Sequence, residues 1–213
     1  MERTVTVTGT GRCTLPPDTI RMHFTLTAKD PDYAAVMQDA DRRFAALQSA
    51  AKAAGIAPEQ LRTESWHVDT DYEHLPDEHG NYRQVFPGYV CRQMLLLEIG
   101  VDLKLLGAVI QAAESSGADP EFRISFTLRN RDTVHDALLK AAAEQARRDA
   151  EILAAASGAK LGALAAIRYR DDAPQLTAGT EMMLRAAKMN DAAAMTPEQI
   201  TAEESAVFVW ELL

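Results

Sequence analysis

The feature that most constrains the fold of this chain is a pattern that occurs twice. Residues 20–26, Ile-Arg-Met-His-Phe-Thr-Leu, alternate like a strand and resemble residues 122–128, Phe-Arg-Ile-Ser-Phe-Thr-Leu. Each run leads into a long stretch with apolar residues three and four positions apart, which indicates an amphipathic helix. Each helix is expected to end at a glycine, Gly55 or Gly158, because a helix often ends in a left-handed residue. A strand, a long loop and another strand follow each glycine.

The chain therefore predicts two β-α-β-loop-β repeats, at about residues 19–101 and 121–213, within a single domain of residues 1–213. Residues 3–13 alternate Val with Thr and predict an extra first strand. Residues 103–116, preceded by the capping residue Asp102, predict a short connecting helix. We expect an α+β fold with the helices packed on a mixed sheet.

The composition argues against several classes of function. The formal net charge of −9, from 22 Lys and Arg against 31 Asp and Glu, disfavours binding to nucleic acids, which are polyanions. No run approaches the ~18 apolar residues of a membrane span. Gly9 and Gly11 form a Gly-x-Gly motif, but a strand follows instead of a helix, so neither a dinucleotide nor another cofactor is predicted. Cys13 and Cys91 form no disulfide framework, and their redox state stays open.

One polar cluster is a candidate metal site. His67, Asp69 and Asp71 share one face of the predicted strand 61–72, and His74 and His79 lie in the acidic loop 73–83. Imidazole and carboxylate ligands suit Zn, Mn or Fe. The spacing matches no established metal motif, and the solvated face of a half-buried strand explains it as well. A metal-binding protein or metal-dependent enzyme is therefore the alternative function.

No catalytic residue is predicted. The chain has no Gly-x-Ser-x-Gly motif, and neither cysteine has a neighbouring histidine in sequence. His23 and His135 are interpreted as structural. A third class, a carrier of a small ligand, is disfavoured because the Ala-rich helix faces allow close packing and leave little space.

A long irregular segment, residues 171–203, precedes the last strand and is expected to hold a helical turn around residues 181–188. Segments of this length are usually functional or disordered. Methionine suits adaptable contact surfaces, and the absence of Cys or His from the segment disfavours a copper(I) site. We expect this segment and loop 73–83 to contact other subunits or a protein partner, with strand edges as a second route. The interface candidates are Met182, Met183, Met189 and Met195.

Several motifs, taken together, resemble the SIMPL domain family over nearly the whole chain. The N-terminal half contributes three: Val-Thr-Val-Thr-Gly-Thr-Gly at 5–11 followed by Pro17-Asp18, then Gly88-Tyr89, then Asp102 with Leu106-Gly107. The C-terminal half contributes Ala-Arg-Arg-Asp-Ala-Glu-Ile-Leu at 146–153, Ser-Gly-Ala-Lys-Leu-Gly at 157–162, Pro-Glu-Gln-Ile at 197–200 and Val-Phe-Val-Trp-Glu-Leu at 207–212.

The resemblance implies an α+β protein without established enzymatic activity that forms large ring-like homo-oligomers. Some family members are associated with stress tolerance, and many are periplasmic or surface proteins. Residues 1–7 show no signal-peptide pattern, so the cytoplasm is the expected location. We therefore expect a non-enzymatic homo-oligomer of unknown physiological role, with a stress-related or partner-binding function.

Overall fold

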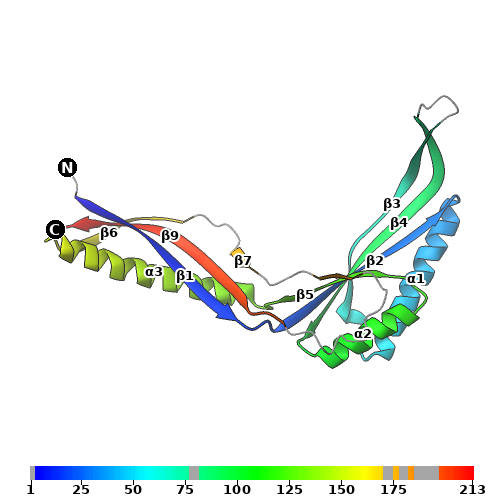
Figure 1. Cartoon of the computed structure of the whole chain (residues 1–213), viewed down its shortest axis with the longest axis horizontal. Coiled ribbons are helices and arrows are strands. Elements are labelled where there is room, and N and C mark those ends of the chain that lie inside the picture. Colours follow the sequence, from blue (N-terminus) through cyan, green and yellow to red (C-terminus); the bar gives the residue numbers. More distant parts are fainter. Residues whose placement is uncertain (1–2, 77–81, 170–174, 178–181, 185–196) are drawn as a thin grey trace. The chain divides into compact units, whose positions relative to one another are not determined.

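The computed structural model describes residues 3–76, 82–169, 175–177, 182–184 and 197–213. The chain forms two compact units, each built from a sheet with helix packed against it (Figure 1). Unit 1 comprises residues 1–18, 127–179 and 197–213, and unit 2 comprises residues 19–126 and 180–196. The N-terminal and C-terminal strands therefore belong to the same unit.

Unit 1 packs one long helix on an antiparallel sheet. Strands β1 (Thr4–Leu15), β9 (Ile200–Leu212) and β6 (Leu161–Arg168) lie in the order β1-β9-β6, and the short β7 (Gln175–Thr177) also pairs with β9. Helix α3 (Arg131–Ala156) packs mainly on β1 and β9 (Figure 1). Its core joins Val7, Ala146, Ala150, Phe208 and Trp210.

Close approach between α3 and β1 explains the Gly-x-Gly motif. A Cβ atom on Gly9 would lie 2.0 Å from the carbonyl oxygen of Ala142, and one on Gly11 would lie 2.0 Å from that of Leu138. Only glycine tolerates a neighbouring backbone at this distance. The side chains on the helix face toward the sheet are correspondingly small, and Ala142, Ala146 and Ala150 are fully buried. The motif therefore serves helix packing.

Unit 2 holds the larger core. Its strands are β3 (Leu61–Pro76), β4 (Tyr82–Gly100), β2 (Thr19–Asp30), β5 (Glu121–Thr127) and β8 (Met182–Leu184), in that order across the sheet. One face carries α1 (Tyr33–Ala53) and α2 (Leu103–Ser115), and the short 3₁₀ turn η1 (Pro58–Gln60) precedes β3. Large apolar side chains fill the space between them, among them Ile20, Met22, Phe24, Leu95, Leu97 and Ile110.

Local signals place the helix ends where the sequence predicts them. The Asp32 side chain accepts a hydrogen bond from the Ala35 backbone N–H at 2.9 Å, and Asp102 caps α2 in the same way. Both carboxylates satisfy backbone donors that have no partner within the helix. Gly55 and Gly158 take positive φ values just beyond α1 and α3, as expected for helix ends.

The structure confirms the α+β fold and alters several details. Where the sequence suggests one mixed sheet, the strands form two sheets: β5, predicted to begin the second repeat, lies beside β2, while β1 lies beside β9. The β3–β4 hairpin extends into predicted loop 73–83. Met182–Leu184 is a strand and not part of a helical turn. Within the described residues, no helix is long and apolar enough to cross a membrane.

Candidate functional site

The predicted metal ligands lie along β3 of unit 2. His67 Nε2 is 3.6 Å from Asp69 Oδ2, and both side chains are exposed. Asp71 instead accepts a hydrogen bond from Lys29 Nζ at 2.7 Å. Only the backbone of His74 is described, and His79 lies outside the described residues. Among the described side chains, no three His, Cys, Asp or Glu groups are placed to hold one metal ion.

Cations of the protein itself neutralise neighbouring carboxylates on this sheet face. Glu98 accepts hydrogen bonds from Arg21 at 2.6 Å and Arg62 at 2.7 Å, and the Arg21 contact lowers the pKa of Glu98 below its ordinary value. The hydrogen bond from Lys29 lowers the pKa of Asp71 in the same way. A metal ion bound at Asp71 or Glu98 would have to displace these ammonium or guanidinium groups, so of the predicted ligands with described side chains only His67 and Asp69 are free of such a cation.

A polar cluster in unit 1, which the sequence did not suggest as a site, surrounds His135 near the start of α3. His135 Nε2 lies 3.2 Å from Tyr169 Oη, and His135 Nδ1 lies 3.6 Å from Glu204 Oε2. The Glu204 side chain is only 9% exposed. His135 Nδ1 is buried and has no hydrogen-bond partner among the described residues. The imidazole on α3 is therefore hydrogen-bonded to Tyr169, which follows β6, and lies beside Glu204 of β9 without a hydrogen bond to it.

Exposed apolar side chains gather on the outer strand of each sheet. In unit 1, α3 covers mainly β1 and β9, and β6 keeps Leu164 46% and Ile167 55% exposed. In unit 2, α1 packs on β2 and β4, and β3 keeps Trp66 46% and Tyr72 49% exposed. Because α3 and α1 each pack mainly on two strands, β6 and β3 keep these apolar side chains exposed to solvent. Sequence analysis predicted these strands but had no signal for which would be outermost.

Of the predicted interface methionines, two lie in a described element. Met182 and Met183 belong to β8, where Met182 is in register with Ile124 and Met183 with Arg123 of β5. Met189 and Met195 lie outside the described residues. β8 therefore extends the sheet of unit 2 beyond β5.

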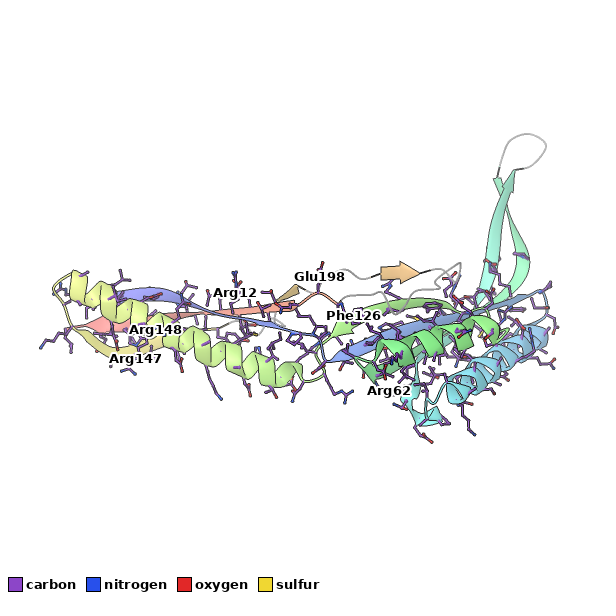
Figure 2. All side chains as sticks on the ribbon, turned by 60° about the horizontal axis from the view of Figure 1, so that its bottom comes forward. Arg12, Arg62, Phe126, Arg147, Arg148 and Glu198 are labelled. Atoms are coloured by element: carbon purple, nitrogen blue, oxygen red, sulfur yellow. The ribbon has the colours of Figure 1, made fainter. Side chains whose placement is uncertain are left out.

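The family motif at residues 146–153 has a clear structural basis. Ala146 and Ala150 are fully buried against the sheet, whereas Arg147 and Arg148 extend from α3 into solvent (Figure 2). Arg147 Nε donates to Glu151 at 3.1 Å, one helical turn later. The small residues in the motif allow close packing against the sheet, and the two arginines give the helix a charged side that faces water.

Comparison with known proteins gives one family and no assigned activity. Residues 5–209 match the family model described as SIMPL, protein of unknown function (DUF541). No curated protein matches the chain. Among solved structures, CutA from Synechococcus elongatus is similar over 61% of this chain and 95% of its own, with 14% sequence identity and a TM-score of 0.23, a value too low to support an argument. The family match spans almost the entire sequence, and the chain therefore belongs to the SIMPL family.

Proposed function

We propose that this chain is a non-enzymatic protein whose working form is a homo-oligomer. The observation that carries the proposal is the uncovered apolar surface of β6, where Leu164 and Ile167 are about half exposed. Burial of apolar surface stabilises an association by roughly 25 cal/mol per Å². Unprotected strand edges with such side chains usually acquire a partner. The assembly would serve as a scaffold for a further protein partner or in a stress response.

The absolute mass in solution tests this proposal. Light scattering on a sizing column should give a discrete multiple of the 23.3 kDa chain mass. A monomer at micromolar concentration would contradict self-assembly as the working property. Deletion of residues 178–194 removes three of the four predicted interface methionines. It should lower the number of chains in the oligomer if that segment contributes contacts between subunits. An unchanged mass would restrict the interface to the remaining surface.

The second candidate function is metal binding at β3. It is favoured by His67 and Asp69, whose exposed side chains lie 3.6 Å apart at their closest polar atoms. Completion of this site requires further ligands, for which the sequence offers His74 and His79. Elemental analysis of untagged protein should then give one metal per chain, and His67→Ala should abolish it. Substoichiometric metal that His67→Ala leaves unchanged would exclude the site.

We also propose the cytoplasm as the working compartment. Cys13 and Cys91 are not paired with each other, and Cys91 is buried. Burial also raises the pKa of the Cys91 thiol, which suits a stable reduced side chain. Fractionation of cells expressing the full gene would contradict this location if the protein appeared outside the cytoplasm.

A further inference from the structure

We propose that two copies of this chain join edge to edge through β6, antiparallel, with Leu164 of one copy opposite Ile167 of the other. This inference rests on the proposed function, because it names the surface, the partner and the symmetry of the self-assembly. The partner is a second copy, and the contact is a two-fold contact in which both copies use the same strand.

Strand β6 is an unprotected edge of the sheet of unit 1. It pairs with β9 on one side, and no described strand pairs with its other side. Its residues 161–167 contain no proline and no charged residue, the usual means of blocking an edge. The opposite edge of the same sheet is different: there the Thr10 N–H of β1 donates to Gln145 Oε1 of α3 at 2.7 Å, and the exposed side chains are polar or charged, namely Thr4, Thr6, Thr8, Arg12 and Thr14.

The side chains of β6 are also self-complementary. Leu164 is in register with Trp210 and Ile167 with Phe208, so both lie on the face of the sheet that carries α3. They share a face, although three positions apart, because an irregularity between Leu164 and Ala166 shifts the register. A two-fold axis between Ala165 and Ala166 brings each Leu164 opposite an Ile167 on that face. Paired side chains of neighbouring antiparallel strands lie about 5 Å apart, within contact distance.

This pairing would extend an existing core. Phe208 and Trp210 of β9 are already buried under α3 and stack on each other with ring centroids 5.6 Å apart. Leu164 and Ile167 lie directly beside these rings on the next strand. The second copy would cover the exposed side of this row, so that one apolar layer would run through both sheets.

The charges near β6 also suit a second copy of the chain. A net charge of −9 per chain makes copies repel each other, so a stable contact needs local compensation. Arg168 and Glu211 are both exposed and both lie on the sheet face opposite α3, near opposite ends of β6. In the proposed register Arg168 of the second copy lies opposite Ala163. Its backbone is then two strand spacings, about 10 Å, from the backbone of Glu211 on β9. Gly162 and Ala163 have no long side chain that would block an approach between them.

The symmetry repeats this placement of opposite charges at the other end of the contact. In each pair Arg168 comes from β6 of one copy and Glu211 from β9 of the other. An unrelated partner strand would have no reason to carry this arrangement, whereas a second copy always does. The charge pattern therefore selects self-association over a different partner for this edge.

The primary test measures association by light scattering and sedimentation for three proteins. Ile167→Lys should weaken association about tenfold or more, because it places two unpaired ammonium groups in the contact. The matched control is Ile152→Lys on α3, where the native side chain is 65% exposed and lies two positions from the buried Ala150 and Ala154. The control should keep the wild-type mass. Both variants should keep the wild-type circular dichroism spectrum, because both side chains face solvent in the single chain.

A charge-reversal pair tests the register. Arg168→Glu alone and Glu211→Arg alone should each weaken association, and the double variant should restore it. A wild-type chain that is monomeric would overturn this inference together with the proposed function. An oligomer that Ile167→Lys leaves intact would overturn the β6 contact alone. Loss of association without rescue by the double reversal would overturn the proposed antiparallel register.

Discussion

Units 1 and 2 use one arrangement with two kinds of packing. In both, a long helix covers two strands and leaves the outer strand open, β6 in unit 1 and β3 in unit 2. Unit 2 fills its interior with large side chains such as Phe24, Leu95 and Leu97, and adds a second helix. Unit 1 brings backbones close together through Gly9 and Gly11. Stability is therefore expected to depend on buried area in unit 2 and on close steric fit in unit 1.

The outer strands differ as strongly as the cores. β3 carries Arg62, His67 and Asp69 among its exposed residues, so charge protects its edge despite Trp66 and Tyr72. β6 carries no charge before Arg168. One helix-on-sheet arrangement can therefore have either a charged outer strand or an uncharged, apolar outer strand, depending on a few side chains.

The largest expected effect is in the core of unit 2. Phe24→Ala should lower the free energy of unfolding by about 3–5 kcal/mol, because it leaves a cavity next to Phe122, whose ring centroid is 6.1 Å away. Each unit contains one tryptophan, Trp66 in unit 2 and Trp210 in unit 1. Urea unfolding followed by Trp66 fluorescence, in a Trp210→Phe background, checks the result. A loss below 1 kcal/mol would refute dependence on buried area.

The next effect sharpens the contrast in unit 1. Gly9→Ala should cost about 1–3 kcal/mol, because its new methyl group would overlap the Ala142 carbonyl oxygen and push α3 away from β1. The fluorescence of Trp210 in a Trp66→Phe background reports this unit. Thr8→Ala is the control, since Thr8 lies next to Gly9 on β1 in the same unit and its side chain is exposed. Equal stability of the two variants would show that close approach is not what holds α3 on the sheet.

A smaller effect is expected at the His135 cluster. His135→Ala removes one hydrogen bond of Tyr169 and leaves Glu204 buried without its neighbouring imidazole, which should cost about 1–2 kcal/mol. Hydrogen exchange of the β6 amides should increase at the same time. His67→Ala, at an exposed position, should stay within about 0.5 kcal/mol of the wild type. If both variants behaved alike, the cluster would not anchor β6.

The smallest effect concerns the charged face of unit 2. Because Arg21 lowers the folded-state pKa of Glu98, the stabilisation is complete above the ordinary carboxyl pKa and is lost as the pH falls through the lowered value. Glu98→Gln should remove this part of the acid dependence and cost less than about 1 kcal/mol at neutral pH, as the pair is partly exposed. Thermal unfolding between pH 3 and pH 7 tests it. If the unfolding temperature of Glu98→Gln fell with decreasing pH as it does in the wild type, the contribution of the Arg21–Glu98 pair would be refuted.

Much of the local structure was predictable from the sequence. The apolar spacing and the capping residue Asp102 indicated the helices, and Gly55 and Gly158 marked helix ends with positive φ. These signals act within a few residues, so they are readable without tertiary structure. The proposed origin of the fold as two repeats also depends on such local patterns and remains a prediction.

The candidate sites were less accessible to sequence reasoning. His67, Asp69 and Asp71 were placed correctly on one strand face, but no spacing rule indicated that Lys29 would pair with Asp71. His135, Tyr169 and Glu204 come from three separate elements. Their approach depends on which strands pair, and strand pairing is set by contacts between distant segments of the chain.

The sequence by itself determined the family, the α+β class and the faces of the helices, because these depend on periodicity and local motifs. Only the tertiary structure decided that β1 closes the sheet of unit 1 while β5 joins unit 2, since either strand has the alternation to fill either place. It also decided that β6 is an outer strand. Exposure of Leu164 and Ile167 follows from the width of one helix over three strands, a property of the assembled layers and not of any local pattern.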